Sequence, residues 1–246
     1  MIIELFGPPA AGKTTLARSL AAHLRSSGRP VELVLSVRPA EAPEARAEGP
    51  SAAPSWGLVR RLMAPAMELL AWAGRVRAGS RRGGLASRLL QLLPPSNPVT
   101  SLRLRQYIQR LESSWRLAER SAATVIFDQG FVQLICSLLL YVRSASPREI
   151  EQAVAAIPKA DQWIHVEAPR ELLQARLEAR RRGQSWFERQ CELDMETSLR
   201  SIEILKMLES ILRRSDPGVG RVSPAATWEA LKPGPIAPGA GTGRAD

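Results

Sequence analysis

The 246-residue sequence has few cysteines and no long hydrophobic run. Two cysteines, Cys136 and Cys191, cannot form a disulfide framework and match no metal-binding spacing, so we expect a reducing compartment, most simply the cytoplasm. The longest apolar stretch, residues 131–142, is shorter than the roughly 20 residues of a membrane-spanning helix, and it predicts a buried helix instead. The first residues show neither a basic region nor a cleavage site, which argues against a secretory signal.

Lysine is also scarce, although the net charge is +10. Of 34 basic residues only four are lysines, at positions 13, 159, 206 and 232. The arginines are spread over many predicted helices and form no single stripe. This distribution predicts attraction for phosphate-bearing ligands and argues against nucleic-acid binding.

The hydrophobic patterning predicts one α/β domain over residues 1–231. Strands are expected at 2–6, 31–37, 124–127, 163–166 and, more weakly, 219–222. Helices are expected at 13–26, 56–77, 85–93, 101–121, 131–143, 147–157, 169–182, 187–213 and 227–231. The strand–helix–strand order at the start predicts a parallel sheet with a right-handed crossover. Residues 39–54 are expected to form an exposed loop, and residues 233–246 a disordered tail.

A glycine-rich loop follows the first strand, and it matches G-x-x-x-x-G-K-[ST] at every fixed position. Its residues are Gly7, Pro8, Pro9, Ala10, Ala11, Gly12, Lys13, Thr14 and Thr15. Such a loop turns backbone N–H groups around a β-phosphate at the start of a helix. We expect Lys13 to contact the β- and γ-phosphates and the Thr14 hydroxyl to bind Mg²⁺. The alternative is an ordinary glycine turn before a helix.

Two further patterns could place charged side chains near this loop. The strand at 124–127 ends in Asp128, which can bind a magnesium-bound water or accept a proton from an acceptor hydroxyl; the alternative is a helix cap. Arg176 and Arg180 share a helix face before a break at 183–185, and they could stabilise a transferring phosphoryl group. The alternative there is a solvated basic helix end.

With these motifs in order, most of residues 1–231 resembles the nucleoside-monophosphate-kinase-like P-loop proteins, thymidylate kinases most closely. The resemblance rests on the loop 7–15 and on three further segments. These are Val37-Arg38-Pro39, Asp128-Gln129-Gly130-Phe131, and Val166-Glu167-Ala168-Pro169 followed by Arg176 and Arg180.

The resemblance implies a three-layer αβα P-loop NTPase fold with a five-stranded parallel sheet, a helical insert between strands two and three, and a lid at 180–187. It implies MgATP over the P-loop, with Lys13, Asp128 and Arg180 as catalytic residues. The acceptor is expected near Arg38, Arg105, Asp128 and Gln129, although both arginines could instead be ordinary surface residues. Gln129 stands where the family has an arginine, which favours an acceptor other than thymidylate.

The insert at 56–93 mixes tryptophans and leucines with arginines. It predicts either a helical cover over the acceptor pocket or an amphipathic helix that contacts a membrane or a partner.

Three functions remain open from the sequence. The first is an ATP-dependent phosphotransferase that acts on a small acceptor: a nucleotide, a nucleoside or another hydroxyl compound. The second is a P-loop ATPase or regulatory switch without an acceptor, and the third is a nucleic-acid-binding ATPase. The sequence does not decide whether the chain is a monomer or a homodimer.

Overall fold

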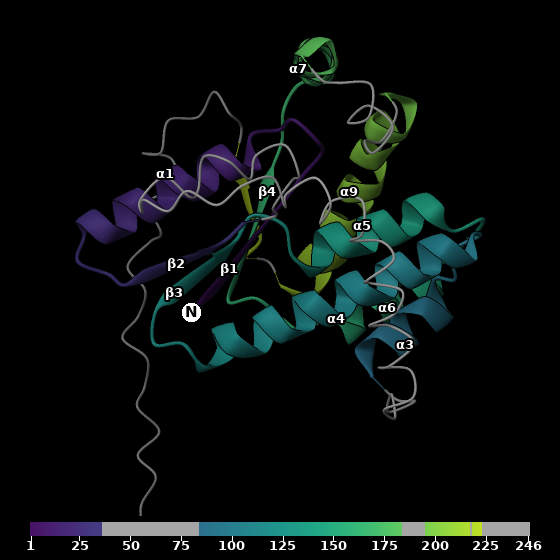
Figure 1. The fold of residues 1–246 in the computed structure, drawn as a ribbon, viewed down its shortest axis with the longest axis horizontal. Coiled ribbons are helices and arrows are strands. Elements are labelled where there is room, and N and C mark those ends of the chain that lie inside the picture. The colour runs from purple at the N-terminus through teal and green to yellow at the C-terminus, as the bar shows by residue number, and fades with distance from the viewer. Residues whose placement is uncertain (36–83, 184–194, 217, 223–246) are drawn as a thin grey trace, which may run out of the picture.

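The computed structural model describes residues 1–35, 84–183, 195–216 and 218–222 (Figure 1). Five parallel strands form one sheet in the order β2-β3-β1-β4-β5. Their bounds are β1 Ile2–Phe6, β2 Val31–Val34, β3 Thr124–Phe127, β4 Gln162–Val166 and β5 Gly220–Val222. The strand that leads into the P-loop is therefore the central one, with β3 on one side and β4 on the other.

Strand β1 is buried along its whole length because both faces of the sheet are covered. Its side chains alternate between two hydrophobic clusters, with Ile2 and Phe6 in one and Ile3 and Leu5 in the other. Glu4 therefore points to the same face as Ile2 and Phe6.

Helices cover both faces (Figure 1). The helices α1 (Lys13–Ser26) and α7 (Arg170–Gly183) contribute to the cluster around Leu5. Five helices build the larger cluster around Phe6: α3 Leu85–Leu92, α4 Pro98–Arg120, α5 Phe131–Tyr141, α6 Pro147–Ala156 and α9 Met195–Ser215. Within the described residues, no helix combines the length and apolar content that crossing a bilayer requires.

The predicted fold class is confirmed: the sheet has five parallel strands and a helical layer on each face. Some helix ends differ from the predictions. Helix α4 begins at Pro98 and not at Ser101, because the Asn97 side chain caps it by accepting from the backbone N–H of Val99. Pro169 precedes the first turn of α7, although its carbonyl accepts from the N–H of Leu173.

Several predictions fall outside the described residues. They are the loop at 39–54, the helix at 56–77, residues 36–37 of the second strand, residues 184–187 of the lid, residues 187–194 of the helix that became α9, the helix at 227–231 and the tail at 233–246.

Candidate nucleotide site

The P-loop connects β1 to α1 at the carboxyl end of the sheet, where ligands bind in open α/β folds. Two of its glycines are required by the geometry. A side chain on Gly7 would lie 2.3 Å from the backbone oxygen of Val166 on the neighbouring strand. Gly12 takes φ 95°, in the left-handed region, where it begins α1. Ala10 also has a positive φ of 63°, so the backbone changes direction sharply within the loop.

The ammonium group of Lys13 lies inside this loop. Lys13 is buried, and its Nζ donates to the carbonyl oxygens of Gly7 (2.7 Å) and Pro8 (2.9 Å). The loop is thus held closed around its own lysine. A buried ammonium at a helix N-terminus is suited to binding phosphate oxygens. The ammonium and the N-terminal end of the helix dipole are both positive, and the site is partly shielded from water.

The side chains of Thr14 and Asp128 meet beside the loop. The sequence analysis assigned both to Mg²⁺ binding, and that role stays a prediction. The Thr14 Oγ1 donates to Asp128 Oδ2 at 2.9 Å, and Asp128 is fully buried. Hard oxygen ligands of this kind, a hydroxyl and a carboxylate, are those that Mg²⁺ prefers. The donor set therefore fits Mg²⁺, with Thr14 and Asp128 as the residues that would hold it.

Arg176 reaches the same loop from α7. Its Nη1 donates to the carbonyl oxygen of Ala10 at 3.1 Å and lies near Gly12. Arg180 follows one helical turn later on α7, but its side chain is outside the described part of the structure. The role of Arg180 therefore stays a prediction.

Of the four residues predicted on the acceptor side, the structure describes Arg105, Asp128 and Gln129. Arg38 falls outside the described residues, Gln129 is half-buried next to Asp128, and Arg105 is half-buried on α4. On the same helix, Tyr107 was not predicted. Burial, together with the charges of Glu4 and Asp128, raises the pKa of Tyr107 to about 12, which keeps its phenol neutral.

Glu4 is the other functional candidate that the sequence analysis missed. It is fully buried, and its Oε1 accepts from the backbone N–H of Val132 at 2.6 Å. Burial raises the pKa of Glu4 to about 8, against the opposing effects of Val132 and the Trp163 indole. The signal in the sequence was a single carboxylate inside an otherwise apolar buried strand.

Gln133, also on α5, contacts the P-loop. Its Oε1 accepts from the backbone N–H of Gly7 at 3.3 Å. Because Glu4 in turn holds the first turn of α5, side-chain contacts run both ways between the β1–P-loop unit and α5.

An ionic cluster around the buried Glu209 joins β4, α9 and β5. The His165 ring stacks on Phe6 with 4.7 Å between centroids, and its Nδ1 is 2.8 Å from Glu209 Oε2. Arg213 and Arg221 both donate to Glu209. Burial opposes ionisation of Glu209, but these hydrogen bonds lower its pKa to about 2. His165, Glu167 and Glu209 lie close enough to share a cation, but the two guanidinium groups already neutralise Glu209, so we read the cluster as structural.

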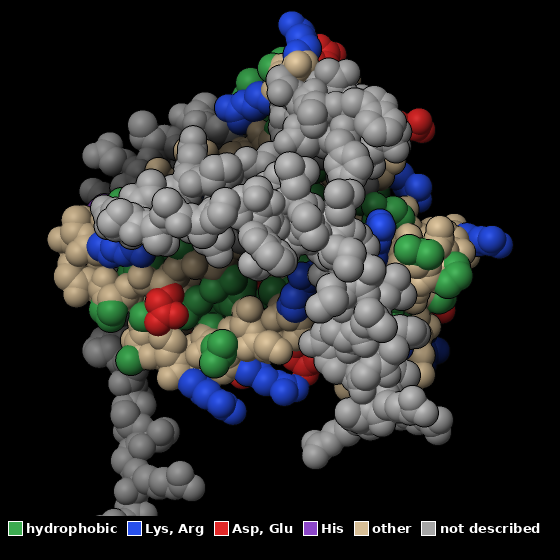
Figure 2. Space-filling view, viewed as in Figure 1, with side chains coloured by type: hydrophobic (Ala, Val, Ile, Leu, Met, Phe, Trp, Pro, Cys, Tyr) green, Lys and Arg blue, Asp and Glu red, His purple; other side chains and the backbone are tan. Residues whose placement is uncertain are grey.

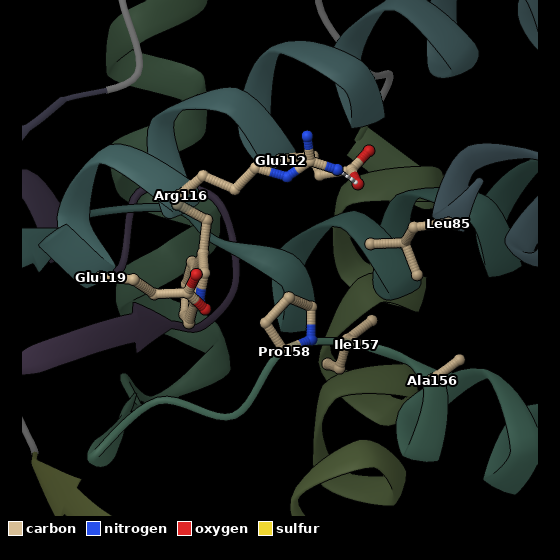
Figure 3. A pocket seen from close by; sticks show the side chains of 8 residues that line it. Leu85, Glu112, Arg116, Glu119, Ala156, Ile157 and Pro158 are labelled. Atoms are coloured by element: carbon tan, nitrogen blue, oxygen red, sulfur yellow. Dashed lines mark hydrogen bonds and ion pairs between the residues drawn. The ribbon is translucent and has the colours of Figure 1, made fainter. Parts of the chain in front are cut away.

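A cavity of about 290 Å³ opens elsewhere (Figure 3). It is lined by α4, by the start of α3 and by the end of α6 with the segment that follows, and its lining includes Glu112, Arg116 and Pro158. Glu112 and Arg116 form an ion pair across one turn of α4. Because this segment precedes β4, the cavity lies away from the phosphate loop and is not part of the candidate site.

No family model matches the sequence, and no curated protein sequence matches it. Among solved structures, the chain is similar to a deoxyadenosine kinase from M. mycoides with the products dCMP and a flexible dCDP bound. That match has 10% identity and a TM-score of 0.52, and it covers 94% of each chain. Structures of the same enzyme with dATP or dCTP bound match at 12% and 13% identity, with TM-scores of 0.43 and 0.44 and the same coverage.

The sheet order, the P-loop at its centre and this structural match identify the fold. The chain has the fold of the P-loop nucleoside kinases.

Proposed function

We propose that the protein is an ATP-dependent phosphotransferase that moves the γ-phosphate of MgATP to a small acceptor with a free hydroxyl. One observation carries the proposal: the buried Lys13 ammonium and the Thr14–Asp128 pair converge on a glycine-rich loop at the carboxyl end of the central strand. Phosphoryl transfer needs little covalent chemistry from the protein, and such a site supplies positioning and charge stabilisation.

Each residue has a distinct role in this proposal. The P-loop amides and Lys13 would bind the β- and γ-phosphates, and Arg176, which already contacts the loop, would add charge above it. Thr14 and Asp128 would hold Mg²⁺, which supplies neutralisation of the phosphate charge when bound. Asp128 would also accept a proton from the acceptor hydroxyl, with Gln129 beside it.

The test is ADP release measured with and without a panel of acceptors. The panel contains deoxynucleosides, nucleotides, sugars and hydroxylated antibiotics; deoxynucleosides are included because the similar structure is a deoxyadenosine kinase. We expect turnover to depend on one acceptor class, and Lys13→Ala to lower it by at least about a hundredfold, since Lys13 stabilises transition-state charge. Arg18→Ala, an exposed change on α1, is the matched control.

Two results would count against the proposal. Basal hydrolysis that ignores every acceptor would favour an ATPase or switch. Failure of the wild-type protein to bind any nucleoside triphosphate would exclude both.

A further inference from the structure

We infer that Glu4 is a positioning residue: its side chain seats the turn between β3 and α5 and thereby fixes where Asp128 and Gln129 stand beside the P-loop. The first support is its place in the sheet. Glu4 pairs with Phe127 on β3 and with Trp163 on β4, directly beneath the point where β3 ends and the turn begins. The strand that carries the P-loop thus also carries the support for the turn opposite.

The contact between Glu4 and the turn is close. The backbone N–H of Val132, in the first turn of α5, donates to Glu4 Oε1. Gly130, the residue before α5, has no side chain that caps the helix. Glu4 therefore supplies from another strand an acceptor that helix N-termini usually obtain from their own capping residue.

Because Gly130 has no side chain, the turn leaves space for the carboxyl group of Glu4. A Cβ at this position would lie 2.5 Å from the Glu4 carboxyl carbon and 2.7 Å from Oε1. Its φ of −121° lies outside the left-handed region, and the carboxyl group of Glu4 occupies the space that a side chain at this position would need. The Trp163 indole on β4 also lies close enough to Glu4 to lower its pKa, so the carboxyl group contacts both this turn and the neighbouring strand.

The seated turn holds the chemistry of the proposed function. Asp128 precedes Gly130 by two residues and accepts from Thr14 on the other side of the site. A shift of the turn would therefore move Asp128 relative to Thr14, and it would reach the P-loop backbone only through the contact of Gln133 with Gly7.

A double-mutant cycle tests the contact between Glu4 and the β3–α5 turn without any ligand. We expect Gly130→Ala to lower the urea midpoint clearly in the wild-type background. In the Glu4→Ala background the loss should be about half or less, because neighbours that compete for one space are not additive. Gly84→Ala is the matched control, since no described residue lies within 4 Å of a Cβ there, and its effect should be the same in both backgrounds. Additive effects of Gly130→Ala and Glu4→Ala would overturn the inference.

A binding experiment tests the positioning role, and this arm rests on the proposed function. ADP affinity is measured by calorimetry with Mg²⁺ and with EDTA. Glu4→Gln keeps an acceptor for Val132 and should bind like the wild type, whereas Glu4→Leu should weaken MgADP binding by about fivefold and leave ADP in EDTA unchanged. Ile2→Ala, on the same face of β1, controls for general destabilisation and should show no such magnesium dependence.

Equal losses with and without Mg²⁺, or no loss in Glu4→Leu, would show that Glu4 does not act through Asp128. If the wild type binds no nucleotide at all, the proposed function fails, and the double-mutant cycle alone decides whether Glu4 seats the turn.

Discussion

At the scale of single residues, the position of Gly7 is set by its distance to strand β4. A methyl group there would lie 2.3 Å from the Val166 carbonyl oxygen, and that oxygen belongs to a strand of the sheet, so it cannot move aside. We expect Gly7→Ala to lower the free energy of unfolding by about 2–4 kcal/mol through this overlap. Urea unfolding would measure the loss. Gly28→Ala, with φ 76° but no described atom within 4 Å of the added Cβ, separates backbone strain from overlap.

Glu4 predicts a pH dependence of stability. Its pKa is about 8 in the folded state and 4.5 in a solvated chain, so the folded state keeps a proton that the unfolded state releases. Stability should therefore fall as the pH rises from about 4.5 to 8, and Glu4→Gln, which cannot ionise, should avoid that loss. We expect the gain of Glu4→Gln over the wild type to grow by about 2–4 kcal/mol between pH 5 and pH 8.5. A gap that stays constant across this range would contradict the prediction.

The sequence identified Lys13, Thr14 and Asp128 because each stands in a local pattern: a fixed spacing in the loop, or the end of an apolar strand. Tyr107 stands in no such pattern, and for Glu4 the local signal is only that a carboxylate stands inside an apolar strand. Their importance depends on which strand neighbours which and on what covers the sheet, and neither is written in nearby residues. Arg176 lies between these cases, since its helix position was readable but its contact with Ala10 was not.

At the scale of elements, α6 shows a cap that its own sequence supplies. Ser146 Oγ accepts from the N–H of Glu149, and the Glu149 carboxylate accepts from the N–H of Ser146. We expect Ser146→Ala to cost about 1 kcal/mol of stability because the first turn of α6 loses this acceptor. Nucleotide affinity should not change, because α6 lies on the larger cluster away from the P-loop; a change in affinity would show that the two are coupled.

The ends of elements were the least predictable from sequence. Periodicity located α4 but placed its start three residues late, because the Asn97 cap and Pro98 precede the first apolar residue of the repeat. Helix α5 ends at Tyr141, although the apolar pattern continues to Val142. Apolar spacing reports which face is buried, whereas the last residue of a helix depends on where backbone groups find other partners.

At the scale of the whole molecule, the sheet was predictable because it follows from a few general rules. A βαβ start implies parallel strands with right-handed crossovers, and apolar strands without alternation imply burial on both faces. The order β2-β3-β1-β4-β5 was not predicted, because the residues of a strand do not show which strands lie beside it.

The charge of the molecule predicts how nucleotide binding responds to salt. The net charge is +10, and Figure 2 shows Lys and Arg side chains at several separate places on the visible face. We expect raising NaCl from about 50 to 300 mM to weaken ATP binding several-fold, because surface charges beyond the Debye length become screened. Adenosine, which carries no phosphate, should lose little affinity in the same calorimetric titration; an equal loss for both would show that the net charge contributes nothing.

The hydrogen bonds of Lys13 to Gly7 and Pro8 have one more consequence. If phosphate binds to Lys13 as proposed, it would have to replace one or both backbone carbonyls as partners of the ammonium group. The same bonds brace the peptide curl while it waits. Removing that lysine should therefore loosen the loop before any nucleotide arrives, and amide hydrogen exchange across residues 7–12 would register the change in protein alone.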